Sequence, residues 1–458
     1  MNRIEDLQRD SVPVARLRVP PGPKGGLILG VMPEFNRDTL SFIERAKDHG
    51  DVVRMRFFYL TVHFLYHPTH IEHVLSTNAR NFIKSRSLRT PFFRRLVGKG
   101  LLTSEGEVWK RQRRLAQPAF HRQRISAYGD VMVEYTRRMV SQWKPGEKRD
   151  IHRDMMRLTL EIVVKTLFDA DVSQDADKVG NVLSRLVMPF ASQATLKWIA
   201  DNRLPTPTHR SFNRDVDEID SIVYRIIEER RRSGIDQGDL LSMLLAAHDE
   251  DGSQMTDRQL RDEVMTLFLA GHETTALTLS WVWYLIARNP SVEQKFHQEL
   301  DEVLRGRAPV AADLPRLKYS EMIAKEAMRL YPPAYGVGRE ALEDCEIGGF
   351  RIPRGSQLFM FQWVTQRDPR FFPDPDQFKP ERWTEEFINT LPKYAYFPFG
   401  GGPRVCIGNY FAMMEIVLLM ATIGQRFRFS VQQEKPVKLL PAMSLRPKDG
   451  IHVTVGAR

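Results

Sequence analysis

The sequence predicts one large, mainly α-helical domain with a smaller β portion, which places it in the α+β class. Residues from about 105 to about 305 follow a mostly helical pattern, with few glycines inside the periodic segments. Stretches rich in β-branched and aromatic residues at 51–67 and 343–364 predict short strands. No internal repeat or low-complexity linker divides the chain, and its 42% hydrophobic content is ample for one large core.

The first 19 residues are polar and charged, so we expect a flexible tail before a single domain of residues 20–458. The segment PPGPKGG at 20–26 forms a stiff lead-in to that domain. The sequence has no run of about 20 apolar residues and no apolar N-terminal signal region. We therefore expect a cytoplasmic protein without a transmembrane anchor, and we expect it to be a monomer.

The longest predicted helix begins after Thr256 and ends at Asn289-Pro290. Thr256 and Gln259 form a capping-box signature at its start, and the residue before a proline disfavours helix. About 33 residues in a helix extend over roughly 50 Å, enough to cross a domain. Breaks between helices are predicted at MPFASQ (188–193) and LPTPTH (204–209).

After the helical region, the strands at 343–364 surround a Gly-Gly turn. Residues 367–383 are punctuated by prolines and predict a meander with little regular structure. A final apolar helix is predicted from near Cys406 to about Gln425.

Charge and cysteine content limit the possible functions. A net charge of +10 suits nucleic acid, a membrane surface or an acidic protein partner. Nucleic acid is not expected, because the chain has no arginine-rich tail and no basic helix with interleaved aromatic residues. The two cysteines, Cys345 and Cys406, cannot form a disulfide framework, which fits a reducing compartment.

The segment FPFGGGPRVCIGNYFA at 397–412 places Cys406 between glycines and the start of the final helix. Most free cysteines are small buried hydrophobic residues. Here the glycines allow the backbone to approach a flat ligand, and the helix start favours a thiolate. Arg404 lies two residues away, where it can meet a carboxylate. A single thiolate is a poor zinc site but suits an axial bond to haem iron.

This segment resembles the haem loop of the cytochrome P-450 family. The family pattern is Phe, two residues, Gly, three residues, Cys, one residue and Gly, and it is matched by Phe399, Gly402, Cys406 and Gly408. The resemblance covers nearly the whole chain from Pro20 onward. It implies the P-450 fold, with haem b between the long central helix and the cysteine loop and with Cys406 as its axial ligand.

The long helix is interrupted by AGHETT at 270–275, where a glycine and a polar cluster coincide in an apolar segment. That coincidence disfavours a solvated face or an ordinary core threonine. A zinc-protease HExxH motif is excluded, because Ala276 occupies the place of the second histidine. The cluster resembles the oxygen-activation motif of the family. The resemblance implies that Gly271 opens a groove over the iron, Thr274 hydrogen-bonds dioxygen and Glu273 relays protons, with no role for His272.

Two further segments resemble family motifs. Glu326 and Arg329 are three apart in KEAMRLYPP, where the simplest alternative is a surface ion pair. By resemblance they match the Glu-x-x-Arg helix, and with Arg382 of KPERW they would form a buried structural ion-pair network. Trp383 stands where the family usually has phenylalanine.

The resemblance also implies contacts with the haem propionates from Trp109, Arg113, Arg339 and Arg404. Trp109 and Arg113 are four residues apart, hence on one helical face. GVGREA at 336–341 superficially resembles a dinucleotide-binding fingerprint, but no clear strand precedes it and no convincing helix follows. We therefore expect no flavin or nicotinamide domain, so that electrons must come from another protein.

These motifs predict a bacterial-type P-450 monooxygenase that uses dioxygen to hydroxylate or epoxidise an apolar small molecule. Fatty acids, terpenoids, steroids and macrolides all remain open as substrates, with Ala270 and Ala334 as contacts and with segments at about 82–100 and 186–206 lining the pocket. The expected electron donor is a ferredoxin or flavodoxin with its reductase. It would dock on the basic cluster of Lys110, Arg111, Arg114, Arg122 and Arg124.

Two alternatives remain at this point. A peroxygenase would draw oxygen from hydrogen peroxide, but the intact Glu273-Thr274 pair argues against it. A haem-binding sensor or carrier would not need the acid–alcohol pair, and no appended signalling domain is evident in the sequence.

Overall fold

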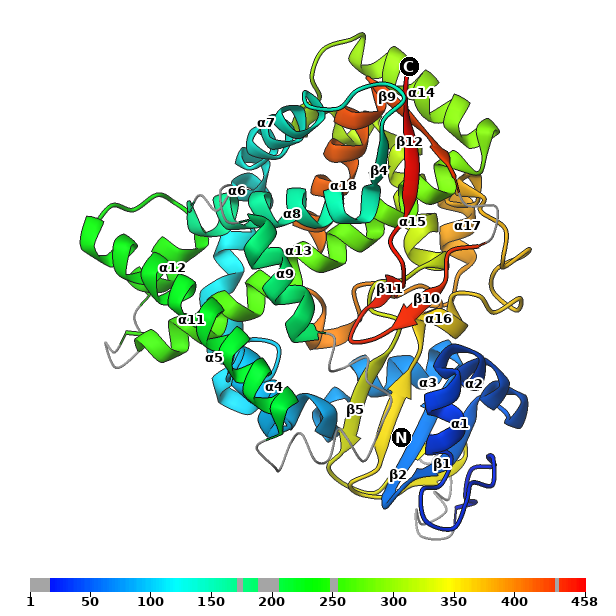
Figure 1. Ribbon diagram of the computed structural model, residues 1–458. Coiled ribbons are helices and arrows are strands. Elements are labelled where there is room, and N and C mark those ends of the chain that lie inside the picture. The colour runs from blue at the N-terminus through cyan, green and yellow to red at the C-terminus, as the bar shows by residue number, and fades with distance from the viewer. Residues whose placement is uncertain (1–16, 171–175, 188–205, 248–253, 433–435) are drawn as a thin grey trace, which may run out of the picture. The chain divides into compact units, whose positions relative to one another are not determined.

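The computed structural model describes residues 17–170, 176–187, 206–247, 254–432 and 436–458 (Figure 1). The chain divides into two compact units, each assembled from several segments. The first unit contains the residues up to Arg86 together with 336–368 and 392–405, and the second contains 87–335, 369–391 and 406–458. The single domain expected for residues 20–458 stays a prediction.

The first unit is built on a five-stranded sheet in the order β1-β2-β8-β5-β3. β1 and β2 form the antiparallel hairpin predicted at 51–67, with Val53 opposite Phe64. β2 pairs in parallel with β8, and β5 pairs antiparallel with both β8 and β3. The elements of this unit are α1 (Met32–Arg37), α2 (Thr39–Ala46), β1 (Val52–Phe57), β2 (Leu60–Leu65), α3 (Pro68–Glu72), β3 (Phe82–Lys84), β5 (Val337–Ala341), β6 (Cys345–Ile347), β7 (Phe350–Ile352), β8 (Gln357–Met360) and α16 (Gln362–Thr365).

The Gly-Gly turn predicted within 343–364 joins β6 to β7. Gly348 and Gly349 have φ angles of +61° and +80°, a left-handed conformation that side chains rarely adopt. The predicted strands are therefore confirmed, and all of β5 lies within GVGREA, which is a strand rather than a phosphate-binding turn.

The second unit surrounds α13 (Asp257–Ala287), the predicted long helix, which has 31 residues. Its capping box is confirmed: the backbone N–H of Gln259 donates to Thr256 Oγ1 at 3.2 Å, and that of Thr256 donates to Gln259 Oε1 at 2.8 Å. The helix ends three residues before Pro290, the first residue of α14. Most α13 side chains are buried, and the helix packs against α8, α11, α15 and α18.

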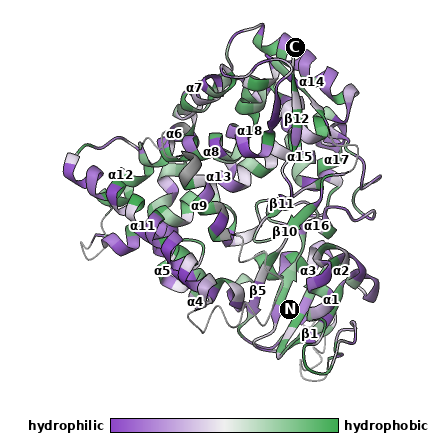
Figure 2. Ribbon diagram, viewed as in Figure 1, coloured by the Kyte–Doolittle hydropathy of each residue, from purple (hydrophilic) through white to green (hydrophobic). Residues whose placement is uncertain are grey.

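The other elements of this unit are mostly helical. Charged residues are frequent along α11, which is largely purple in Figure 2. Two small antiparallel sheets, β4-β12-β9 and β10-β11, complete the unit. The bounds are α4 (Pro91–Val97), α5 (Gly106–Ala116), α6 (Arg122–Ala127), α7 (Gly129–Val140), β4 (Lys148–Asp150), α8 (Ile151–Phe168), α9 (Ala176–Val187), α11 (Pro207–Ser233), α12 (Leu240–Ala246), α14 (Pro290–Leu304), α15 (Lys318–Leu330), α17 (Glu385–Thr390), α18 (Asn409–Gly424), β9 (Phe427–Val431), β10 (Leu439–Pro441), β11 (Leu445–Pro447) and β12 (His452–Ala457).

The fold class predicted from the sequence is confirmed, with small differences at element ends. The final helix α18 begins at Asn409 rather than at Cys406, because Gly408 is its N-cap. α11 begins inside LPTPTH, with Thr206 as its N-cap. The predicted break at 188–193 and most of the expected pocket segment at 186–206 lie outside the described residues.

Candidate functional site

Cys406 lies three residues before the start of α18 and is exposed, whereas Cys345 is buried. The backbone N–H of Gly408 donates to the sulfur, and the Arg113 guanidinium is close enough to favour a negative charge on it. Desolvation by the surrounding protein nevertheless raises the pKa of the thiol and outweighs both groups. The helix start therefore favours a thiolate, as expected, but does not by itself outweigh the desolvation of the sulfur. A metal cation on the sulfur would keep it deprotonated.

The preceding loop lies in the first unit. One of its glycines is required by the packing of the protein's own backbone. Gly402 has a φ angle of +64°, and a Cβ atom there would lie 1.7 Å from the carbonyl oxygen of Leu75. Only glycine fits this approach of two backbone segments. Close approach to a flat ligand is thus not needed to explain Gly402. Phe399 and Arg404 are both half-buried in the same loop.

The AGHETT segment opens one side of α13 in the middle of an otherwise buried helix. Ala270 is exposed and Thr274 is half-buried, while the helix is buried over 260–269 and 275–286. Ala270 and Thr274 are four residues apart and therefore share a face. The Thr274 hydroxyl donates to the Ala270 carbonyl oxygen at 2.9 Å. These two residues present a small apolar group and a hydroxyl side by side.

Gly271 faces a neighbouring helix. A Cβ atom at this position would lie 2.8 Å from Cγ2 of Val163 on α8, closer than van der Waals contact permits. The glycine thus allows α13 and α8 to cross closely. The expected groove over the iron at Gly271 stays a prediction.

Glu273 is buried and ion-paired with a residue that the sequence motifs did not identify. Arg446 on β11 lies 2.7 Å from Glu273 Oε1, and the Ser444 hydroxyl donates to the same oxygen. Both partners follow the apolar run LLPAM near the C-terminus. The available signal in the sequence was a single arginine that follows a mostly apolar run.

The two histidines near this carboxylate are uncharged at neutral pH. Burial lowers the pKa of His272, whose Nδ1 lies 2.8 Å from the Phe268 carbonyl oxygen. Burial also lowers the pKa of His152 to about 4. The positive charge beside Glu273 therefore comes from Arg446.

Glu326 and Arg329 form the core of a buried network. Both side chains are fully buried, and Arg329 donates to both carboxylate oxygens at 2.9 Å. Arg382 donates to Glu326 Oε1 at 2.9 Å, so the structure joins all three predicted members. The Trp383 indole N–H adds a further bond at 3.0 Å, which the usual phenylalanine could not make.

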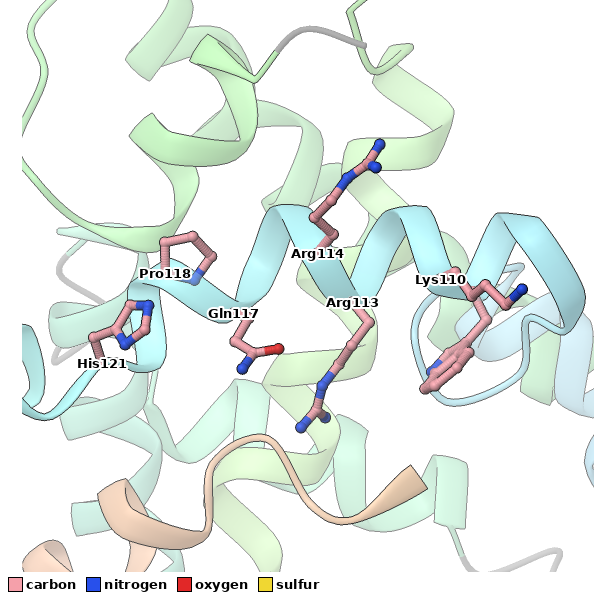
Figure 3. Close-up of a pocket in the computed structure, with 7 residues that line it drawn as sticks. Lys110, Arg113, Arg114, Gln117, Pro118 and His121 are labelled. Carbon is pink, nitrogen blue, oxygen red and sulfur yellow. The ribbon is translucent and has the colours of Figure 1, made fainter. Parts of the chain in front are cut away.

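Trp109 and Arg113 both border one hollow of about 410 Å³ along α5, together with Lys110, Arg114, Gln117, Pro118 and His121. Arg113 and Gln117 point to one side of the helix and Arg114 to the other (Figure 3). Arg113 is therefore separated from the outward-facing Arg114 and is the arginine near Cys406.

Arg339, the remaining expected propionate ligand, lies on β5 in the first unit. It is buried, and its guanidinium donates to the Gly338 carbonyl oxygen at 2.9 Å. Ala334, the expected substrate contact after α15, is half-buried.

Comparisons with known proteins identify the family. A family model described as Cytochrome P450 matches residues 20–455, nearly the whole chain. The chain belongs to the cytochrome P450 family. This P450 is 37% identical over 423 residues to cyclooctatin synthase of Streptomyces melanosporofaciens, covering 92% of this chain and 90% of the relative. It is 32% identical over 412 residues to pentalenene oxygenase of Streptomyces avermitilis, and the match covers 90% of this chain and 91% of the relative.

Solved structures agree with the family assignment. Retinoic acid-bound cyanobacterial CYP120A1 superimposes with a TM-score of 0.87 and 26% identity, covering 96% of this chain and all of that chain. The heme domain of cytochrome P450DA superimposes with a TM-score of 0.86 and 28% identity, and the match covers 96% of this chain and 98% of that chain. The protein is a P450 monooxygenase, and its haem has a cysteine axial ligand. Among the described residues, no helix combines the length and apolarity needed to span a bilayer.

Proposed function

We propose that this P450 binds haem through Cys406 and oxidises an apolar, terpenoid-like small molecule with electrons from a separate protein. The observation that carries the proposal is the open face of α13, where Ala270 and Thr274 interrupt a buried helix. The exposed thiol with its amide donor and nearby arginine suits a metal-bound thiolate. When bound, the haem supplies the redox chemistry that activates dioxygen.

The residues of the chain have separate tasks in this proposal. Trp109, Arg113, Arg339 and Arg404 hold the haem propionates, because arginine and indole N–H groups suit carboxylates. Thr274 orders a proton next to the reacting oxygen through its hydroxyl, whose lone pairs remain acceptors while it donates to Ala270. Glu273 supplies the carboxylate through which protons reach Thr274.

The substrate class is inferred from the relatives and from the site. The names of two relatives, cyclooctat-9-en-7-ol 5-monooxygenase and pentalenene oxygenase, denote a cyclic alkenol and an alkene. Such molecules carry few polar groups, which agrees with the small apolar side chains of Ala270 and Ala334. Of the substrate classes left open by the sequence, terpenoids are therefore proposed over fatty acids, steroids and macrolides.

The carbon monoxide spectrum of the reduced protein tests the ligand. The wild type should show the red-shifted Soret band of thiolate-bound haem, and Cys406→Ser should lose it. Cys345→Ser is the matched control, because that thiol is buried and matches no haem-loop pattern, and it should keep the band. A normal band in Cys406→Ser would show that another residue binds the iron.

A further inference from the structure

Two buried side chains near the C-terminus, Ser444 and Arg446, contact one carboxylate oxygen of Glu273, which is also buried. Glu273 on α13, Arg446 on β11 and Ser444 are 3%, 7% and 5% exposed. Arg446 Nε and Nη2 each lie 2.7 Å from Glu273 Oε1, and the Ser444 hydroxyl donates to the same atom. A buried charge of this kind is stable only when it is paired and hydrogen-bonded.

The segment that carries Arg446 is held in place on both sides of this residue. Leu445 is fully buried, and its backbone N–H donates to the Pro333 carbonyl oxygen at 2.9 Å. β10 and β11 pair antiparallel, with Pro441 opposite Leu445 and Leu439 opposite Pro447 (β11 is red in Figure 1). The Arg446 guanidinium thus reaches Glu273 from a fixed backbone, as a preorganised site requires.

The other titratable groups around Glu273 do not substitute for Arg446. His152 on α8 and His272 on α13 interact electrostatically with both Glu273 and Arg446, and burial keeps both rings neutral. Asp150 lies next to His152 and adds negative charge. Removal of Arg446 would leave the Glu273 carboxylate buried without a cation among these groups, and such a carboxylate takes up a proton.

We propose that Arg446 and Ser444 are positioning residues that keep Glu273 ionised and in one orientation, so that reduced oxygen yields product rather than hydrogen peroxide. The inference rests on the proposed function, because it assumes that Glu273 passes protons. In the uncoupled case, dioxygen takes up two electrons and two protons and leaves as hydrogen peroxide. An ionised and fixed carboxylate accepts protons from water and passes them on without first reorienting.

The test measures product and hydrogen peroxide per donor electron pair from pH 6 to 9, with a heterologous ferredoxin and ferredoxin reductase. A panel of terpenes, steroids and fatty acids is screened first, and the compound that the wild type oxidises is the probe. Arg446→Met should lower product per electron pair at pH 7 by about tenfold, less than the ~10²–10⁴-fold in rate that loss of an acid–base group costs, because the Glu273 carboxylate itself remains. Hydrogen peroxide should rise, and product yield should recover toward alkaline pH, where the unpaired Glu273 ionises.

Arg446→Lys keeps the cation and should restore most of the yield. In a Glu273→Gln background, adding Arg446→Met should change neither the yield nor its pH profile, because the target carboxylate is gone. A wild-type yield and pH profile in Arg446→Met would overturn the proposal. An undiminished effect of Arg446→Met in the Glu273→Gln background would also overturn it.

Each variant is checked for the thiolate Soret band. If Arg446→Met does not fold, Ser444→Ala carries the test, with a smaller loss of yield that must vanish in the Glu273→Gln background. Failure of the proposed function looks different: the wild type would oxidise no compound of the panel. Failure of this inference alone leaves an active wild type whose variants couple equally well.

Discussion

Thr274 is one of two side chains that break the buried surface of α13, and its hydroxyl has no packing role there. Thr274→Ala removes this hydroxyl and keeps a good helix former, so the fold should survive. We expect haem content and substrate affinity to stay close to wild type. Consumption of the electron donor should continue while product falls and hydrogen peroxide rises, because the proton is no longer ordered.

Donor, product and peroxide are measured in one reaction to check this prediction. Thr278 offers a matched control, since its hydroxyl also donates to a carbonyl oxygen four residues earlier, that of Thr274, at 3.0 Å, but the residue is buried. Thr278→Ala should leave coupling unchanged. If Thr274→Ala couples as efficiently as wild type, Thr274 is a core threonine and protons arrive by another route.

Trp383 donates to a fully buried carboxylate, so its indole N–H should contribute measurably to stability. Trp383→Phe keeps an aromatic ring and removes one hydrogen bond to a charged group. The free energy of unfolding should fall by about 1.5–3 kcal/mol, the usual value for such bonds. Unfolding in urea, followed by tryptophan fluorescence and by circular dichroism, measures the loss.

Trp363→Phe is the control for this change. The Trp363 indole N–H donates at 2.6 Å to Glu44, which is exposed and can be rehydrated. The loss should be about 1 kcal/mol or less. Equal losses at the two positions would show that burial of Glu326 adds nothing to the strength of the Trp383 bond.

At the scale of elements, the crossing of α13 and α8 depends on Gly271. Gly271→Ala gains about 1 kcal/mol of helix propensity. The new methyl group would lie 2.8 Å from Val163 Cγ2, and overpacking of this kind costs about 1–3 kcal/mol. We expect a net loss of stability of about 1 kcal/mol, measured by urea unfolding.

Two comparisons isolate the helix contact. In a Val163→Ala background, Gly271→Ala should become neutral or stabilising, because the clashing atom is gone. Gly180→Ala on α9 should be stabilising in the wild type, since the nearest described atom to its methyl group would be Leu160 Cδ2 at 3.9 Å. The packing role is refuted if Gly271→Ala has the same effect with and without Val163.

At the scale of the whole molecule, the net charge of +10 is consistent with an acidic electron donor. In the expected docking cluster, Lys110, Arg114, Arg122 and Arg124 are exposed and Arg111 is half-buried. Lys110 is paired with Glu107, and Arg122 lies over the Tyr410 ring. Arg114 borders the α5 hollow and points away from Arg113, so it is the best residue to test (Figure 3).

Electron transfer from an acidic ferredoxin should slow with rising salt, because the Debye length falls from about 10 Å at 0.1 M to about 3 Å at 1 M. Arg114→Glu should reduce the rate at low salt and flatten its salt dependence. Lys144→Glu, which reverses an exposed charge between α7 and β4, should have little effect. If the electron-transfer rates measured by stopped flow change neither with salt concentration nor with Arg114→Glu, the donor does not dock on this cluster.

Much of this P450 was predictable because its signals are local in sequence. The capping box of α13 needs only residues three apart, and the hairpin at 51–67 and the turn at 348–349 follow from residue type. Glu326 and Arg329 pair across one helical turn, so their bond was predictable as well. The spacing around Cys406 identified the haem loop without any knowledge of the fold.

The tertiary structure decided which distant side chains meet and what limits each glycine. Arg446 reaches Glu273 across 173 residues, and no spacing rule connects a C-terminal hairpin to the middle of a helix. Gly271 and Gly402 are constrained by Val163 and by the Leu75 carbonyl group, which the chain brings close only on folding. The raised pKa of Cys406 likewise depends on how much protein surrounds the thiol. Sequence specifies local geometry through each residue's own chemistry, whereas contact, burial and local dielectric depend on packing.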